Sequence, residues 1–153
     1  MQNDEFWMRM ALSIAKSAAR QGEVPVAALI VKNNQLLTSA MNLRESWLDP
    51  TAHCEILALR RAAELLQSWR LNDCEMYVTL EPCLMCAGAL YQARIKRVIY
   101  AARDAKGGAM GSLYEVHSDQ RLNHQIEVTG DICAKESRLM LQDFFRRRRK
   151  KSR

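Results

Sequence analysis

The sequence contains little of what marks a linker between domains. It has only three prolines and six glycines in 153 residues, and no stretch rich in Pro, Ser or Gly divides it. We therefore predict one domain rather than several joined by flexible segments. Hydrophobic residues make up 48% of the chain, so a domain of this length can bury a real core without disulfides.

A long hydrophobic run is also missing. Asp4 and Glu5 stand where a secretory signal would carry positive charge, and the apolar stretch 6–19 is interrupted by Arg9 and Lys16. This pattern fits neither a signal peptide nor a membrane-spanning helix. Five cysteines is an odd number and two of them are clustered, which disfavours a secreted disulfide framework. We expect a cytoplasmic protein with free thiols, a metal site and no membrane partner.

Positive charge is concentrated at one end of the chain. The formal net charge is +6, and the segment 134–153 holds nine Lys or Arg and two acidic residues. The whole basic excess therefore lies there. We predict a domain over 1–145 followed by a basic C-terminal tail over 146–153. A basic run can contact a polyanion such as nucleic acid, or it can be a solvated tail, and composition leaves both open.

Helical and strand patterns alternate along the chain. Apolar residues at three- and four-residue steps predict helices over 4–21, closed by Gly22, and over 49–67, 82–93 and 132–147. Shorter apolar runs predict strands over 24–31, 36–40, 75–80, 97–101 and 125–129, the last as an edge strand. This alternation indicates an α/β fold with a largely parallel sheet after the first hairpin. Three glycines between 107 and 111 predict a flexible surface loop rather than a phosphate cradle.

Two cysteines stand three residues apart where a helix is predicted to begin, in the sequence TLEPCLMC at 79–86. Pro82 suits the first position of that helix, because its missing N–H would have no partner there. The sulfurs of Cys83 and Cys86 then lie on one face of the first turn, where the helix dipole lowers thiol pKa values. Two such thiolates suit Zn²⁺. Alone, the pair is also compatible with a redox site or with chance.

A histidine and a glutamate stand near the predicted start of the preceding helix, in the sequence TAHCE at 51–55. A lone histidine is more often structural than a ligand, and the HxE triplet is common by chance. Together with two thiolates, however, His53 completes the three-ligand set of a catalytic zinc site, whose fourth position stays open to water. Glu55 is a poor fourth ligand for so soft a site and can instead accept the proton of that water.

A closed structural zinc site would need a fourth protein ligand. Cys54 is adjacent to the histidine, and neighbouring side chains rarely converge on one ion. Cys74, Cys133, His117 and His124 lack paired spacing. We therefore favour the open site, and we interpret the three remaining cysteines as small buried residues and the two remaining histidines as residues on or near the surface.

The order HxE followed by PCxxC is the pattern of zinc deaminases that act on cytosine and adenine bases. Beyond it, the sequence closely resembles the bacterial tRNA-specific adenosine deaminases over nearly the whole chain. The zinc motif is shared with relatives that deaminate cytidine, deoxycytidylate or guanine, whereas ARDAK and DFFR are more particular to the tRNA enzymes. The matching stretches are EVPV at 23–26, DPTAH at 49–53, 77–88, ARDAK at 102–106, GSL at 111–113, LNH at 122–124 and DFFR at 143–146.

The resemblance implies a fold, an assembly and a reaction. The fold is a three-layer α/β/α cytidine-deaminase-like sandwich with a five-stranded mixed sheet. The assembly is a homodimer with one zinc ion in each subunit. The reaction is hydrolytic deamination of adenosine to inosine at the wobble position of a tRNA anticodon loop, in bacteria that of arginine tRNA. Water activated by zinc would attack C6 of the adenine while Glu55 carries protons.

The resemblance also assigns residues by position. Zinc ligands of the family correspond to His53, Cys83 and Cys86, and its proton shuttle corresponds to Glu55.

Four further positions correspond to substrate-binding residues. Asn42 matches a residue that hydrogen-bonds the target base, and Val26 matches one that lines the base pocket. Asp104 and Phe145 match positions near the flanking anticodon nucleotides. Without the resemblance, Asn42 would be a turn residue, Asp104 a loop or capping acid, and Phe145 part of the core.

One position departs from the family pattern, which usually has Ala where this chain has Cys54. Its backbone would still face the base, and a thiol is only modestly larger than a methyl group, so we expect the activity to be kept. Two alternatives remain: a deaminase of a free base or nucleotide, and a non-catalytic zinc module that binds RNA. The basic segment disfavours the first, because a small substrate does not need it. Glu55 disfavours the second, because a structural site gains nothing from that carboxylate.

Overall fold

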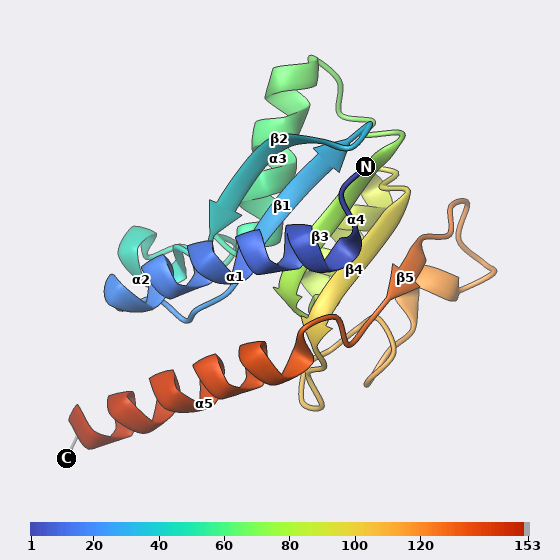
Figure 1. Cartoon of the computed structure of the whole chain (residues 1–153). Helices are drawn as coiled ribbons and strands as arrows, with labels where there is room; N and C mark the ends of the chain where they lie inside the picture. The colour runs from blue at the N-terminus through green and yellow to red at the C-terminus, as the bar shows by residue number, and fades with distance from the viewer. Residues whose placement is uncertain (152–153) are drawn as a thin grey trace.

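A five-stranded mixed sheet forms the middle layer of the computed structural model, which describes residues 1–151 (Figure 1). Its strand order is β2-β1-β3-β4-β5. β1 pairs antiparallel with β2 and with β3, whereas β4 runs parallel to both β3 and β5. All five strands lie where the sequence predicts them, within three residues at each end. Their bounds are β1 Ala27–Lys32, β2 Gln35–Met41, β3 Cys74–Leu80, β4 Arg97–Ala102 and β5 Glu127–Thr129.

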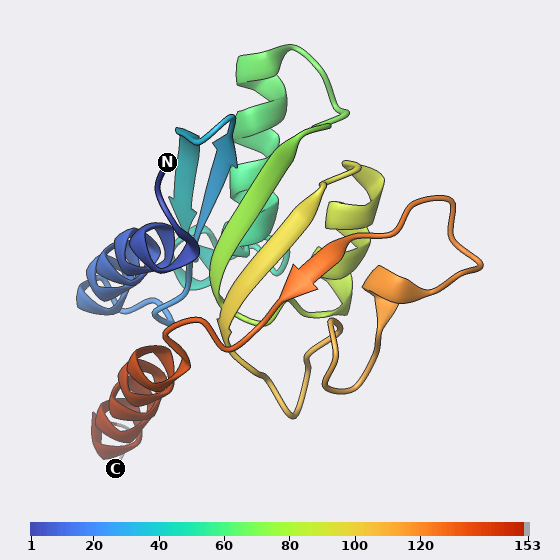
Figure 2. The ribbon, with the colours of Figure 1, turned by 45° about the vertical axis from the view of Figure 1, so that its right-hand side comes forward.

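Helices cover both faces of this sheet. α1 and α5 lie on one face, and α3 and α4 lie on the other (Figures 1 and 2). This confirms the three-layer α/β/α architecture. Within residues 1–151, no helix combines the length and the apolar character needed to cross a membrane. The helical bounds are α1 Asp4–Arg20, α2 Arg44–Trp47, α3 Cys54–Leu66, α4 Leu84–Gln92, the short 3₁₀ helix η1 Val116–Ser118, and α5 Ala134–Lys151.

The sheet is buried on both faces, and β1 shows how. Alternate residues of a strand point to opposite sides. Ala28 and Ile30 pack in the core beneath α3 and α4, whereas Leu29 and Val31 pack against α1. Burial on both faces explains why the strand reads as a continuous apolar run and not as an alternation.

The first helix ends as predicted at a glycine. Gly22 has a φ of 81°, a conformation that glycine adopts without a steric penalty. Its N–H donates to Ala19 O at 3.1 Å, and Glu23 N donates to Ala18 O at 3.0 Å. These two bonds make a Schellman motif. The turn directs the chain inward, so that Glu23 is fully buried.

Two helices begin later than the sequence predicts. Asp49 accepts hydrogen bonds from Thr51 N at 2.8 Å and Thr51 Oγ1 at 2.7 Å, and so stabilises a turn. α3 starts only after His53, its N-cap residue, and α4 starts after Cys83, its N-cap residue, so Pro82 lies outside the helix. Neither N-cap side chain bonds to the helix backbone. The side chain at an N-cap position usually accepts a hydrogen bond from the helix backbone. The side chains of His53 and Cys83 make no such bond and are free to bind another partner.

The C-terminal helix is longer than predicted. α5 continues to Lys151, so the basic run that we expected as a tail forms the last turns of this helix as far as that residue. Residues 152–153 of that run lie outside the described residues. Cations in the last turn of a helix interact favourably with the negative end of its dipole.

An ion-pair network holds α1 against the sheet. Asp4 Oδ2 lies 2.6 Å from Arg97 Nη2, and Tyr77 Oη donates to Asp4 Oδ1 at 2.8 Å. The hydrogen bond from Arg97 is the main cause that lowers the pKa of the Asp4 carboxyl below its ordinary range. The pair is only partly exposed, so solvent screens it less than a surface ion pair.

We expect Asp4→Asn to lower the free energy of unfolding at neutral pH by about 1–2 kcal/mol. A carboxylate with a lowered pKa contributes stability above its unfolded-state pKa, and this contribution is lost as the pH falls through the folded-state value. The difference between variant and wild type should therefore shrink from neutral pH to about pH 3, measured by urea titration. A difference that stays constant over this range would contradict the pairing.

Candidate metal centre and pocket

Segments that lie far apart in the sequence meet at one end of the strands, the edge of the sheet where β2 and β3 terminate. Because β1 runs antiparallel to both neighbours, its first residues lie beside the last residues of β2 and β3, with Ala27 opposite Met41. Asn42 N donates to Val26 O at 3.0 Å just beyond this pair. The chain before α3 reaches the same edge, because Leu43 N donates to the carbonyl oxygen of residue 52 at 3.0 Å. The N-termini of α3 and α4 thus meet at this edge.

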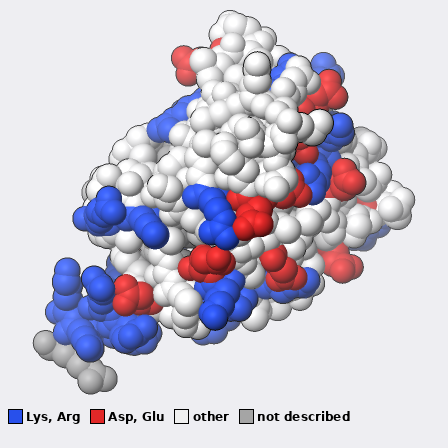
Figure 3. All heavy atoms as spheres, in the orientation of Figure 1, with Lys and Arg blue, Asp and Glu red and all other residues white. Residues whose placement is uncertain are grey.

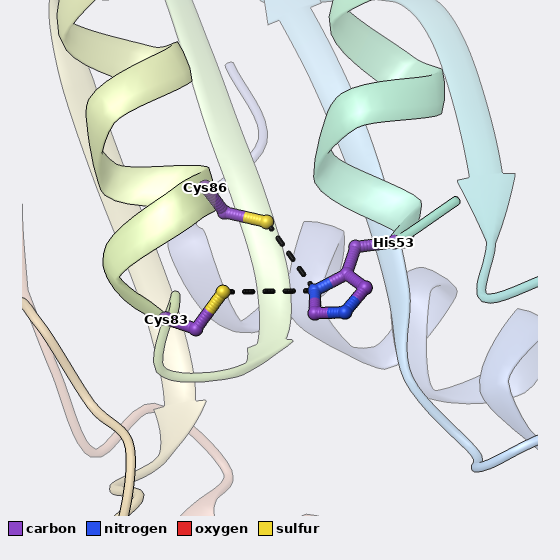
Figure 4. Close-up of side chains that lie close together, drawn as sticks. All are labelled: His53, Cys83 and Cys86. Carbon is purple, nitrogen blue, oxygen red and sulfur yellow. Dashed lines mark hydrogen bonds between the residues drawn. The ribbon is translucent and has the colours of Figure 1, made fainter. Parts of the chain in front are cut away.

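Three predicted ligands converge between the two helix N-termini. His53 projects from the start of α3, while Cys83 and Cys86 project from the first turn of α4 (Figure 4). The histidine Nδ1 atom lies 3.6 Å from Cys83 Sγ and 3.5 Å from Cys86 Sγ. All three candidate ligand atoms lie within 4.8 Å of one another.

The spacing of these atoms fits a tetrahedral zinc ion. With Zn–N of about 2.0–2.1 Å and Zn–S of about 2.3 Å, tetrahedral angles place nitrogen and sulfur about 3.6 Å apart. The observed separations from His53 Nδ1 agree. Among the described residues the ligand group has three members, and Cys54 is not one of them. A neutral imidazole and two thiolates that leave one corner free are the donor set of a catalytic zinc site.

The pKa values of the two thiols are shifted in opposite directions. The Cys86 thiol donates to Cys83, and this hydrogen bond, with the one from His53, lowers the pKa of Cys83 to about 4. The same hydrogen bond, together with burial, raises the pKa of Cys86. The thiolate is the form of cysteine that binds metal ions, so the lowered pKa of Cys83 suits a metal ligand.

Glu55 lies in the first turn of α3, beside the ligand group. Its side chain is 5% exposed, and burial raises the pKa of its carboxyl. The buried Cys54 thiol donates to Glu55 Oε1 at 3.1 Å. A carboxylate in such a site takes up a proton readily, as a general base must. The unusual cysteine therefore contacts this carboxylate directly.

A cavity of about 200 Å³ opens over the ligand group. It brings together the four predicted substrate residues, Glu55 and two of the ligands, while Cys86 lies buried behind it. Cys54, whose backbone was expected to face the base, also lines it, and four further lining residues were not predicted: Val24, Arg44, Leu80 and Glu81. The complete lining is Val24, Val26, Asn42, Arg44, His53, Cys54, Glu55, Leu80, Glu81, Cys83, Asp104 and Phe145.

For three lining residues the sequence also allowed a purely structural role: a turn residue, a capping acid and a core residue. Asn42 accepts a hydrogen bond from Arg44 N at 3.4 Å, so it stabilises the turn after β2 as well as facing the cavity. Asp104 Oδ1 accepts from Lys106 N at 3.1 Å, so it also caps its own loop. Phe145 is 40% exposed and is therefore not a core residue.

The other cysteines and histidines of the described residues are not members of the ligand group. Cys54 and Cys74 are buried, as predicted, whereas Cys133 is only partly buried. His117 and His124 are half-buried.

A buried carboxylate that the sequence did not reveal holds one rim of the cavity. Glu81 is 2% exposed. It accepts hydrogen bonds from Asp104 N at 3.1 Å and from Met110 N and Ser112 N at 3.0 Å, and also from the Ser112 hydroxyl. These bonds fold the segment between 104 and 112 around one side chain. The Asp104 backbone at the cavity rim is thereby fixed by a residue two positions before the candidate ligand Cys83.

The prediction that the glycines between 107 and 111 form a flexible surface loop is therefore wrong. Gly108, Ala109 and Met110 are buried. A Cβ atom on Gly108 would lie 2.3 Å from the Glu81 carboxyl carbon, so the glycine is needed for close approach. The glycine cluster was the available signal, but its buried partner could not be identified from the sequence.

We expect Gly108→Ala to lower the free energy of unfolding by about 1–3 kcal/mol, because the added methyl group displaces the Glu81 carboxylate from its hydrogen bonds. Gly88→Ala is the matched control, since a Cβ there would meet nothing within 4 Å. That change should be neutral or stabilising by up to about 1 kcal/mol within α4. Urea unfolding of both variants measures the difference, and equal stabilities would contradict the close contact.

A second buried carboxylate holds another lining residue of the cavity in place. Glu23 is fully buried. It accepts hydrogen bonds from Glu45 N at 3.1 Å and Ser46 N at 2.6 Å, and from the Ser46 hydroxyl. It thereby fixes α2, a short helix that the sequence did not predict, and with it Arg44 at the cavity. Arg148 of α5 reaches the same helix, 3.3 Å from Glu45 Oε1.

Comparisons with known proteins place this arrangement among deaminases. A model of MafB19-like deaminases matches residues 2–149. The chain is 43% identical to the tRNA-specific adenosine deaminase of Bacillus subtilis, over 99% of this chain and 94% of the relative. It is 45% identical to the tRNA-specific adenosine deaminase of Haemophilus influenzae, over 95% of this chain and 85% of the relative.

Solved structures agree. A structure from work on A-to-I editing by tRNA:A34 deaminases at the wobble position has a TM-score of 0.84 and 40% identity, covering 88% of this chain and 97% of the other. A guanine deaminase from Nitrosomonas europaea has a TM-score of 0.81 at 22% identity, covering 94% of this chain and 85% of the other. At that identity the second likeness concerns the fold alone.

Proposed function

This chain belongs to the MafB19-like deaminases and, among them, to the tRNA-specific adenosine deaminases; from this membership we propose its tRNA, its metal and a role for each residue of the cavity. The reaction is hydrolytic deamination of adenosine to inosine at the wobble position of a tRNA. The tRNA that we propose is the arginine acceptor. The observation that carries the proposal is the convergence of three ligand atoms and one buried carboxyl group at the cavity.

The metal that we propose is Zn²⁺, one ion in each subunit. His53 Nδ1, Cys83 Sγ and Cys86 Sγ would hold it, as their mutual distances allow. Zinc bound there would lower the pKa of a water molecule in the open position and so make a nucleophile available at neutral pH.

Glu55 is the proposed proton carrier. Its carboxyl group lies in the cavity beside the ligand group and is shielded from solvent. It would accept one proton of the attacking water and deliver it to N1 of the adenine, and then accept the remaining proton of the added hydroxyl and deliver it to the departing amine. Burial supports this role, because it brings the proton affinity of the carboxyl closer to that of the groups it exchanges with.

The remaining lining residues would orient the nucleotide. Asn42 would hydrogen-bond the edge of the base, and Val26 would form an apolar wall against the ring. Asp104 and Phe145 line the same cavity and would contact the nucleotides that flank the edited one. An anticodon loop is single-stranded and can place one base in such a cavity at small cost.

The test is incubation with an arginine tRNA transcript, with inosine at the wobble position as the readout. We expect inosine from the zinc-loaded protein and none after zinc is removed with a chelator. Faster turnover of free cytidine, deoxycytidylate or guanine than of tRNA would favour a deaminase of small substrates. A protein that binds the tRNA and contains zinc but forms no inosine would favour a non-catalytic RNA-binding module.

We also propose a homodimer in the cytoplasm. The dimer rests on the family resemblance and is supported by an apolar surface cavity between α3 and α4, in which Arg60 is the charged lining residue. Ala89 lies in that cavity, so Ala89→Glu should shift the mass in sedimentation equilibrium from two chains to one. A wild-type protein that sediments as a monomer would contradict the dimer. The cytoplasmic location is tested separately, by imaging the tagged protein in cells.

A further inference from the structure

The carboxyl group in the cavity has a different hydrogen-bond donor from the carboxyl groups on the surface. Acidic side chains on the surface lie beside Lys and Arg (Figure 3), and Glu5 and Asp131 each pair with an arginine. Glu55 instead accepts a hydrogen bond from the Cys54 thiol, with Sγ 3.1 Å from Oε1. Both residues line the cavity. The proposed proton carrier is therefore held by its neighbour in the chain, from inside the pocket.

Packing fixes the position of this donor. Cys54 is 1% exposed and belongs to the same buried cluster as Leu57 and Ala58 of α3. One side-chain torsion places the sulfur of a cysteine, and close packing around a buried side chain keeps that torsion in one rotamer. A thiol in apolar surroundings also keeps its proton. Cys54 thus has a proton to donate and presents it from a fixed place.

The carboxyl group has more freedom to lose than the thiol. The last side-chain torsion of a glutamate, which turns the carboxyl group, is broad and not confined to staggered positions. Burial of Glu55 at the start of α3 limits where the side chain lies, but it does not by itself select an orientation for the two oxygens. A hydrogen bond to Oε1 does select one. Proton transfer depends on this orientation, because the carboxyl must lie within hydrogen-bond reach of the groups it serves.

An alanine at position 54 could not make this bond. The family resemblance implies alanine there, and a methyl group has no proton to donate. A thiol is only modestly larger than a methyl group, so the two residues differ mainly in the hydrogen-bond donor. Cys54 therefore adds a contact to the proton carrier and changes the volume of the pocket little.

We propose that Cys54 is a positioning residue for the deamination: its thiol holds one oxygen of the Glu55 carboxyl, so that the carboxyl keeps one orientation while the base enters and reacts. This inference rests on the proposed function, in which Glu55 carries the protons. The thiol contacts the carboxyl and takes no part in the proton transfers themselves. Its loss should consequently slow the reaction without stopping it.

The first test compares cysteine, alanine and serine at position 54. Cys54→Ala should lower the single-turnover rate of inosine formation at saturating enzyme by about two- to tenfold, the effect of one hydrogen bond. The enzyme concentration that gives half of this rate should stay close to the wild-type value, because the bond does not hold the substrate. Cys54→Ser should restore most of the rate, since a hydroxyl is also a donor. Each variant should retain one zinc ion per chain.

A control and a double variant separate positioning from packing. Cys74→Ala also deletes a fully buried thiol, but at the start of β3 and outside the cavity, so its rate should equal that of the wild type. In a Glu55→Ala protein, Cys54→Ala should have no further effect, because the two groups act as one unit. An equal fractional loss with and without Glu55 would show that the cysteine acts through packing alone and would overturn the proposal.

Infrared spectroscopy detects the hydrogen bond independently of activity. Zinc binds Cys83 and Cys86 as thiolates, so the S–H stretching bands of the zinc-loaded protein come from the remaining three of its five cysteines. Subtracting the spectrum of the matching Cys54→Ala protein isolates the Cys54 band. This band should move to higher frequency in Glu55→Ala, where the acceptor is missing. A band at the same frequency in both proteins would contradict the hydrogen bond.

The outcomes distinguish this inference from the function on which it rests. No inosine from the wild-type protein, or an unchanged rate in Glu55→Ala, would refute the proposed function. A wild-type protein that forms inosine, together with an equal rate in Cys54→Ala, would refute the positioning role alone. A Cys54→Ala protein that lost zinc in proportion to its activity would also overturn that role, because loss of the metal would then explain the effect.

Discussion

Glu55→Ala is expected to lower the rate of inosine formation by about 10²–10⁴-fold, the usual contribution of a positioned general acid–base group. The substitution removes the carboxyl that receives and returns protons in the cavity, but it leaves the three ligand atoms in place. Zinc content should therefore stay at one ion per chain. The effect should fall on kcat more than on KM, because the lost interaction acts mainly in the transition state.

Glu64→Ala is a suitable control for that experiment. Glu64 lies on the same helix, is exposed, and does not line the cavity. Single-turnover kinetics with the tRNA transcript and elemental analysis of the purified variants measure the two quantities. A Glu55→Ala protein that retained zinc and formed inosine at the wild-type rate would overturn the assigned role of the carboxyl.

Cys86→Ala is expected to remove both the metal and the activity. The sulfur is fully buried behind the cavity, so water cannot easily replace it as a ligand. Loss of an outer-sphere partner of a metal ligand costs about 10–100-fold in affinity or activity, and loss of a ligand itself should exceed this. Because metal binding contributes to folding, the melting temperature should fall as well.

Cys74→Ala separates loss of metal from loss of packing. Cys74 is also fully buried but lies at the start of β3, at the opposite end of the strand from the cavity. The Cys74→Ala variant should be slightly less stable than the wild type but should keep its zinc and its activity. Zinc content after gel filtration and activity with added zinc distinguish the two variants. Stoichiometric zinc in Cys86→Ala would mean that another group completes the site.

The strands and most helix positions could be predicted because they depend on local periodicity. β1 is a short apolar run and α1 repeats apolar residues at helical steps, so each is visible within a few residues. The starts of α3 and α4 were predicted too early, since Asp49 and Pro82 are good helix-starting residues by themselves. The structure instead gives both N-cap positions to candidate ligands, His53 and Cys83.

The two buried carboxylates escaped prediction for a different reason. Glu81 and Glu23 each accept backbone hydrogen bonds from residues 22 to 31 positions away in the sequence. Nothing in the local sequence distinguishes such a glutamate from a solvated one. The glycines near Gly108 showed only that the backbone there is unusual, and their tight packing depends on a side chain from another element.

The sequence by itself determined the chemistry: the residue types and short spacings HxE and PCxxC specify a soft three-ligand donor set with a carboxyl group beside it. Only the tertiary structure decided that these groups meet, because His53 and Cys83 are thirty residues apart and depend on the pairing of β1 with β3. It also decided that Phe145, from the far end of the chain, lines the same cavity as these groups. Local composition encodes reactivity, whereas proximity arises from strand register and helix packing between distant segments.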